Sequence, residues 1–274
     1  MKRAPGRLVL VGHPVAHSLS PALQNAALRY MRLPIVYEAI DVPPHALDDV
    51  VRRLIVARAA GNVTIPHKEA VARLCTRLDT ISERVSAVNA FRVAADGALE
   101  GTNTDVGGFD ALAREAGALR TGARIAVLGA GGSAAAVLAA LERWSGATVV
   151  LFNRTATRAA ALASRFSIVE AVVSTPTQAV RDATVVVNAT SLGLKDGDPF
   201  PVGIEDLRSG AVVLDLVYRP GETGWVKAAR ARGHAALDGF CMLLEQGALA
   251  FEWWLGVGAP RDVMREALAA AAAR

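Results

Sequence analysis

The stretch GNVTIPHK, residues 61–68, contains three side chains that could act on a small polar ligand. Residues two apart in a strand lie on one face, so Asn62 and Thr64 would present an amide and a hydroxyl side by side. Pro66 has no N–H for a strand ladder, and the turn it predicts would bring the Lys68 ammonium close to them. The alternative is an ordinary polar strand end.

A glycine-rich turn, Gly129-Ala130-Gly131-Gly132-Ser133-Ala134, fits the pattern G-x-G-x-x-G/A. An apolar strand pattern precedes it and a helical pattern follows it, which is the setting this motif requires. Glycine lets backbone amides approach a pyrophosphate, whose charge then lies at the N-terminus of the helix. The turn therefore predicts a dinucleotide site.

The next strand pattern ends in Asn153-Arg154-Thr155-Ala156-Thr157-Arg158. In NAD-binding proteins an acidic residue at this place binds the ribose 2'-hydroxyl, whereas arginine accommodates a 2'-phosphate. The two arginines favour NADP over NAD. The alternative is a basic helix start without a ligand, although cations at a helix N-terminus are mildly unfavourable when no anion meets them.

The elements that must position these residues alternate between strands and helices. Ser20 is expected to cap a helix whose first residue is Pro21. Alternation implies parallel sheets with right-handed crossovers, and a hinge at 118–123 divides two α/β domains. The expected strands are 7–12, 35–40, 124–129, 147–152, 171–173, 184–188 and 211–216, and the expected helices are 20–31, 44–57, 66–76, 106–117, 132–143, 156–166, 240–256 and 260–273.

Composition excludes several classes of protein. The chain has 274 residues, 52% of them hydrophobic, and 24 glycines, which suits an α/β enzyme. Its two cysteines, Cys75 and Cys241, lie far apart, which argues against a disulfide framework or a zinc site. The apolar run near the N-terminus is too short for an export signal, so we expect a cytoplasmic protein. The uncharged residues 125–141 fit a strand, turn and helix better than a membrane span.

Charge favours a small anionic ligand over nucleic acid. The net charge is +4, but the basic residues are dispersed and only 5% of residues are aromatic. His13 and His17 are four residues apart, yet Pro14 prevents a regular helix there, so we expect no metal site.

Eight motifs, taken in order, resemble the shikimate dehydrogenase family over nearly the whole chain. They are GHPVAHSLSP, GNVTIPHK, AVN at 87–89, GTNTD at 101–105, GAGGS, NRTATR, NATSLG at 188–193 and DGFCMLLEQ at 238–246. The resemblance implies a substrate domain of residues 1–106 plus 240–274 and a Rossmann-type NADP-binding domain of residues 107–239, with the active-site cleft between them. It also implies reversible NADPH-dependent reduction of 3-dehydroshikimate to shikimate, in aromatic amino acid biosynthesis.

The resemblance further assigns roles to individual residues. Lys68 and Asp105 would flank the reacting oxygen as the catalytic pair, and which of them moves the proton is left open. The implied substrate-binding residues are Ser18 and Ser20 for the carboxylate with Tyr218 assisting, and Asn62, Thr64, Lys68, Asn89, Asp105 and Gln246 around the ring hydroxyls. The implied cofactor-binding residues are Gly129, Ala130, Gly131, Gly132, Ser133, Asn153, Arg154, Thr155, Arg158, Leu216, Gly239 and Met242.

Two other functions fit the same scaffold. One is a quinate/shikimate dehydrogenase of broader substrate or cofactor range, against which the paired arginines and the two serine hydroxyls argue. The other is a non-catalytic NADP-binding sensor, against which the retention of both Lys68 and Asp105 argues. Small molecules are the expected partners, with no nucleic acid or membrane, and the family's mixture of monomers and dimers leads us to expect a homodimer.

Overall fold

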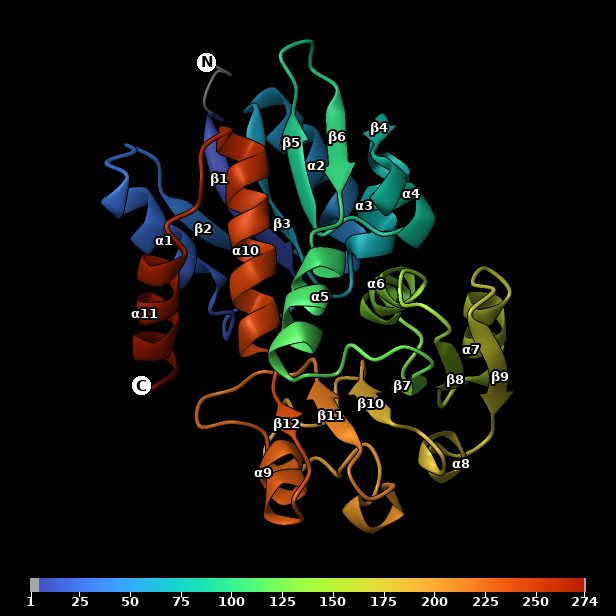
Figure 1. Ribbon diagram of the computed structural model, residues 1–274. Coiled ribbons are helices and arrows are strands. Elements are labelled where there is room, and N and C mark those ends of the chain that lie inside the picture. Colours follow the sequence, from blue (N-terminus) through green and yellow to red (C-terminus); the bar gives the residue numbers. More distant parts are fainter. Residues whose placement is uncertain (1–4, 274) are drawn as a thin grey trace. The chain divides into compact units, whose positions relative to one another are not determined.

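The computed structural model describes residues 5–273, and the chain divides into two compact units (Figure 1). The first unit comprises the residues up to Gly107 together with those from Leu243 onward, and the second is Gly108–Met242. The chain thus returns to the first unit after it has completed the second. Each unit contains one six-stranded sheet.

The sheet of the first unit has the strand order β2-β1-β3-β5-β6-β4 and is mixed. β1 pairs in parallel with β2 and β3, whereas β5 is antiparallel to both β3 and β6. The strands are β1 Arg7–Gly12, β2 Tyr37–Asp41, β3 Ala59–Val63, β4 Arg77–Leu78, β5 Ala90–Val93 and β6 Leu99–Thr102. The helices are α1 Ser20–Tyr30, η1 Pro44–Ala46, α2 Leu47–Val56, α3 Lys68–Leu74, α4 Thr80–Val85, α11 Arg261–Ala272 and most of α10 Phe240–Leu255. The helix α5 Asp105–Glu115 begins in this unit and continues into the second.

Close strand pairing around β1 depends on a glycine. A Cβ at Gly61 would lie 2.0 Å from the carbonyl oxygen of Val9, its partner in the β1–β3 register. A residue without a Cβ therefore lets the two strands approach. All five residues of β3 are buried, so the strand fixes the backbone that leads into the turn at Pro66.

The two C-terminal helices complete the first unit. The α11 helix packs against α1, as Figure 1 shows in red and blue. Gln24 of α1 donates to the Gly247 carbonyl of α10 at 2.9 Å. Arg261 at the start of α11 pairs with Glu245 at 3.0 Å and Glu252 at 2.6 Å on α10. Both ends of the chain therefore build the same unit.

The second unit has a fully parallel sheet of order β12-β11-β10-β7-β8-β9. The order reverses between β7 and β10, which is the switch point where open parallel sheets of this kind bind dinucleotides. The strands are β7 Arg124–Leu128, β8 Thr148–Phe152, β9 Val169–Val173, β10 Val185–Asn188, β11 Val212–Asp215 and β12 Ala236–Leu237. The helices are α6 Gly132–Leu141, α7 Ala156–Ala163, α8 Pro176–Val180, η2 Ile204–Asp206 and α9 Gly224–Ala231.

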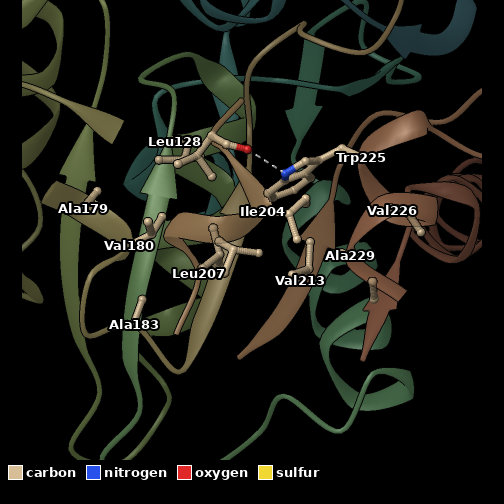
Figure 2. Close-up of a cluster of buried hydrophobic side chains, with 14 of the residues drawn as sticks. Leu128, Ala179, Val180, Ala183, Ile204, Leu207, Val213, Trp225, Val226 and Ala229 are labelled. Atoms are coloured by element: carbon tan, nitrogen blue, oxygen red, sulfur yellow. Dashed lines mark hydrogen bonds between the residues drawn. The ribbon is translucent and has the colours of Figure 1, made fainter. Parts of the chain in front are cut away.

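The core on one side of this sheet gathers around a buried tryptophan. Trp225 packs with Leu128, Val213 and Ile204, and its indole N–H donates to the Val202 carbonyl at 3.1 Å (Figure 2). This bond satisfies the one polar atom that the side chain brings into the core. The core anchors α9 against the sheet beside β11.

The two α/β units and the main strands and helices confirm the sequence prediction, with four differences in detail. The N-terminal part of the first unit ends at Gly107, before the predicted hinge at 118–123. The short helices α8 and α9 were not predicted. The helix α1 begins at Ser20 itself with Leu19 at the N-cap, because the Ser20 amide donates to Ser18 Oγ at 3.3 Å. The first sheet is mixed and not parallel, because β5 and β6 are joined by a turn at Gly97, too short for a crossover.

No helix within residues 5–273 combines the length and apolarity needed to cross a bilayer.

Candidate active site

A partly buried ion pair lies where the first unit brings GNVTIPHK and GTNTD together. Lys68 Nζ donates to Asp105 Oδ2 at 2.7 Å, and the two side chains are 14% and 6% exposed. Lys68 is the first residue of α3 and Asp105 the first residue of α5. Because the carboxylate fixes the direction of the ammonium group, the pair can deliver or receive a proton at a defined point.

Asn89 extends this pair into a network. Its Nδ2 donates to Asp105 Oδ1 at 2.7 Å and lies 3.0 Å from Thr104 Oγ1 and 3.3 Å from Gln246 Oε1. Its Oδ1 accepts from the Thr104 amide at 2.7 Å. An amide nitrogen has two hydrogens for these three acceptors, so a ligand hydroxyl could donate to the one left over.

The buried Asn62 is tied into the same region by residues of two other segments of the first unit. Its Oδ1 accepts from the Tyr37 hydroxyl at 2.8 Å, and its Nδ2 donates to the Asn89 carbonyl at 3.1 Å. Asn62 lies within β3, while Thr64 follows the strand and donates its backbone N–H to the Val11 carbonyl at 2.8 Å. The Tyr37 hydroxyl, which no sequence motif singles out, thus holds the amide that supports Asn89.

Replacing Tyr37 by phenylalanine should lower the free energy of unfolding by about 1–3 kcal/mol, because Asn62 Oδ1 would lose its buried donor. Urea denaturation followed by circular dichroism measures the change. Tyr30→Phe is the matched control, since Tyr30 is 64% exposed. Equal losses in the two variants would contradict a specific role for the Tyr37 hydroxyl.

A hydrogen bond of His67 fixes the backbone just before Lys68, and another bond joins Ser18 to Ser20. His67 is buried, and its Nε2 lies 2.6 Å from the Val42 carbonyl, which can only accept, so this nitrogen carries the hydrogen. This bond fixes the residue before Lys68. Ser18 and Ser20 lie together at the start of α1, where the Ser20 amide donates to Ser18 Oγ. Both serine side chains therefore belong to one short turn.

The glycine turn of the second unit has room for a ligand. A Cβ at Gly131 would meet nothing within 4 Å, and Gly131 is the N-cap of α6 with no side-chain cap. A Cβ at Gly129, whose φ is +118°, would lie 2.7 Å from the Ala189 carbonyl oxygen. The helix N-terminus thus faces space at Gly131, which fits a pyrophosphate, while Gly129 is required by the fold itself.

Replacing Gly131 by alanine should weaken NADP binding on the order of tenfold, because the methyl group would occupy the space of the pyrophosphate. The free energy of unfolding should fall by at most about 1 kcal/mol, because the new methyl group would meet no atom beyond its chain neighbours within 4 Å and alanine is only a poorer N-cap than glycine. Fluorescence titration and urea denaturation measure the two quantities. Gly129→Ala is the contrasting variant and should be destabilised. Unaltered NADP affinity in Gly131→Ala would show that the pyrophosphate does not bind at this turn.

The arginine segment lies next to the glycine turn. The Gly129 amide donates to the Phe152 carbonyl at 2.7 Å, so the ends of β7 and β8 are adjacent. Arg154 and Arg158 are exposed, and neither forms an ion pair with another residue in the range 5–273. Asn153 Nδ2 donates to the Thr155 carbonyl at 2.9 Å, which shapes the turn into α7. The two guanidinium groups are therefore available to an anion such as a 2'-phosphate.

The remaining predicted cofactor residues follow β11 and β12. A Cβ at Gly239 would lie 2.4 Å from the Leu216 carbonyl oxygen, so these two residues are in close contact. Met242 is buried, and the Tyr218 ring packs on Phe240 with centroids 5.9 Å apart. The second unit thus brings its predicted residues to the carboxyl edge of its sheet.

Within residues 5–273 no three His, Cys, Asp or Glu side chains lie close enough together to hold a metal ion. His13 Nδ1 instead lies 3.1 Å from the Asp41 carboxylate.

Three family models match successive parts of the chain. The shikimate dehydrogenase substrate binding domain matches residues 10–91, the shikimate / quinate 5-dehydrogenase model matches 111–193, and the shikimate 5'-dehydrogenase C-terminal domain matches 239–269. Together they match parts of both units and most of the two C-terminal helices.

Whole-chain relatives agree with these matches. The shikimate dehydrogenase (NADP(+)) of Rubrobacter xylanophilus is 46% identical over 266 residues, which is 94% of each chain. The solved shikimate 5-dehydrogenase of Thermus thermophilus, in complex with NADP(H) and shikimate, is 39% identical with a TM-score of 0.87 and covers 97% of this chain and 99% of that one. A quinate dehydrogenase from Corynebacterium glutamicum in complex with NAD is 29% identical with a TM-score of 0.85, covering 96% and 98%.

Proposed function

The chain belongs to the shikimate dehydrogenase family, and we propose that it catalyses the reversible NADPH-dependent reduction of 3-dehydroshikimate to shikimate. The observation that carries the proposal is the 2.7 Å Lys68–Asp105 pair, nearly buried and linked to Asn89. A protein that only sensed NADP would have no need of a lysine and a carboxylate held together in this way. The pair instead suits proton transfer to a carbonyl oxygen.

The residues of the first unit account for the proton half of the reaction. When bound, NADPH supplies the hydride that reduces the carbonyl carbon. Lys68 Nζ then donates a proton to the oxygen as negative charge develops on it, or stabilises that charge. Asp105 orients the ammonium group through its 2.7 Å contact. In the direction of shikimate oxidation the same pair receives the hydroxyl proton.

The proposed substrate-binding residues named below lie in the first unit, and the proposed cofactor-binding residues lie in the second. In the first unit Ser18 and Ser20 hold the substrate carboxylate, and Thr64, Asn89 and Gln246 hold ring hydroxyls. In the second unit the glycine turn holds the pyrophosphate and the Asn153–Arg158 segment holds the 2'-phosphate of NADP. Fit of the cofactor is supported by the open space at Gly131 and the exposed arginines.

Initial rates of the purified protein with shikimate or quinate, each with NADP or NAD, test the proposal. We expect the highest kcat/KM with shikimate and NADP. The chain is also similar to a quinate dehydrogenase solved with NAD. Higher activity with quinate would therefore favour the alternative, a quinate/shikimate dehydrogenase of broader substrate range. No turnover with either substrate, alongside intact NADP binding, would favour a sensor.

We also propose that the protein works in the cytoplasm as a homodimer. The exposed apolar side chains of the first unit, including Tyr30 at 64% and Val36 at 65%, support an interface there. Light scattering at micromolar concentration should give twice the mass of the 28.6 kDa chain. A monomer mass alone would contradict the dimer.

A further inference from the structure

A fully buried carboxylate ends β11 and belongs to none of the sites described above. Asp215 has 0% exposure, and its Oδ1 accepts from the Val217 amide at 3.0 Å and from Asn188 Nδ2 at 2.8 Å. Its Oδ2 accepts from the Thr223 hydroxyl at 2.8 Å. Three donors from three segments therefore converge on one side chain.

Asn188, at the end of the neighbouring strand β10, also forms hydrogen bonds to the segment that follows β10. Its Oδ1 accepts from the Thr190 amide at 3.0 Å and the Thr190 hydroxyl at 2.7 Å, and its Nδ2 also donates to the Leu192 carbonyl at 3.1 Å. The Leu216 amide donates to the Asn188 carbonyl at 3.0 Å. Asp215 and Asn188 thus fix both the NATSLG segment and the segment that begins at Leu216.

The place of these segments in the sheet relates them to the cofactor. Open parallel sheets bind a dinucleotide outside the carboxyl ends of the strands, across the switch point, here between β7 and β10. The glycine turn and the arginines lie on the side of β7 and β8, so the nicotinamide half of a bound dinucleotide would extend over β10 and β11. The close approach of Gly129 to the Ala189 carbonyl joins the two sides.

We propose that Asp215 is a positioning residue whose negative charge holds the segments after β10 and β11 in the conformation that receives the nicotinamide half of NADP. This inference rests on the proposed function. Asp215 itself lies beneath the surface and acts through Val217, Asn188 and Thr223.

The energetics suggest that the charge is retained for a purpose other than stability. Burial raises the pKa of Asp215 to about 6, although the bonds from Thr223, Val217 and Asn188 act in the opposite sense. Among the described residues the charged group that faces it is Asp238, beside it after β12, which raises the pKa further, while β10 and α9 present the neutral Asn188 and Thr223. A buried charge that costs folding free energy is more typical of a functional site than of a core.

The first test is the dissociation constant of NADP for Asp215→Asn relative to the unaltered protein, measured by fluorescence from pH 5 to pH 8. At pH 8 the variant should bind about tenfold more weakly, because a charged acceptor forms stronger hydrogen bonds than a neutral one. As the pH falls through about 6 the unaltered carboxyl gains its proton, so the ratio should approach one. The ratio also cancels the titration of the cofactor's own phosphate, which is the same for both proteins.

The second test needs neither nucleotide nor turnover. Amide hydrogen exchange, followed by NMR at pH 8, should show about tenfold less protection at Val217 in Asp215→Asn. The amide of Val213, which lies in β11 like Asp215 and donates to the Ala235 carbonyl just before β12, should be unchanged. This measurement does not depend on shikimate oxidation. A failure of the proposed function can therefore be distinguished from a failure of the role proposed for Asp215.

Asp238→Asn is the matched control, because it removes a like charge and none of the bonds to Asp215. It should bind NADP normally at pH 8 and move the midpoint of the pH effect to lower pH. An Asp215→Asn to unaltered ratio that does not vary with pH would overturn the proposal. Loss of protection at Val217 without any loss of NADP affinity would also overturn it, since the segments would then be held for the fold alone.

Discussion

Replacing Lys68 by alanine should lower kcat for shikimate oxidation by about 10² to 10⁴, whereas KM for shikimate should change much less. The reason is that the ammonium is expected to act on the oxygen only as charge develops there. Its 2.7 Å contact with Asp105 and its 14% exposure show a side chain held in place and not a mobile surface lysine. Steady-state kinetics, with NADP binding measured separately by fluorescence, provide the two constants.

Two further variants make this result interpretable. Glu69→Ala alters the next residue of α3, which is exposed, and should leave both constants unchanged. Asp105→Asn keeps the shape and a hydrogen-bonding group but removes the charge, so it should lower kcat and raise KM together. A Lys68→Ala enzyme with near-normal kcat and only a raised KM would show that the lysine binds substrate and takes no part in the proton transfer.

Local patterns are sufficient to predict the strands and helices around the glycine turn of the second unit. The apolar run of β7, the glycine turn and α6 are consecutive in sequence, so their order fixes their geometry without long-range information. The same holds for the arginine segment after β8. Short elements such as α8 and α9 escaped prediction, because five to eight residues carry too little periodicity to be recognised.

The contacts of the active site depended on pairing that no local pattern contains. Lys68 and Asp105 were associated through the family resemblance, and the structure places them 2.7 Å apart although 37 residues separate them. Tyr37 reaches Asn62 because β2 and β3 both pair with β1, and the long tyrosine side chain crosses the width of that strand. Side-chain alternation can place Asn62 on a face of a strand, but it cannot say which other strand of the sheet supplies the partner.

The pKa of Asp215 depends on burial, which cannot be predicted from a local pattern or from a single pair of contacts. Its position at a strand end is visible in the sequence, but its burial and its three donors follow from the order of β10, β11 and α9 in space. Whether a carboxylate is exposed or enclosed decides its pKa, and enclosure is a property of the whole sheet. Functional residues that act through others are therefore the ones that sequence reasoning misses first.

The unaltered protein should prefer NADP to NAD by roughly a hundredfold or more in kcat/KM, and replacing both Arg154 and Arg158 by alanine should abolish that preference. Each hydrogen bond to a charged group contributes about 1.5–3 kcal/mol, and about 1.4 kcal/mol corresponds to a factor of ten. Both guanidinium groups are exposed beside the end of β8 and form no ion pair within residues 5–273, so a 2'-phosphate need not displace another partner.

The double variant should lose NADP affinity while its kcat/KM with NAD remains nearly the same, because NAD lacks the phosphate that the arginines bind. Arg120→Ala combined with Arg208→Ala is the matched control, since both residues are exposed arginines of the second unit and the change in net charge is identical. If the control lost NADP preference equally, the cause would be the overall charge of the protein. Equal kcat/KM for the two cofactors in the unaltered protein would show that the segment after β8 does not read the 2'-phosphate.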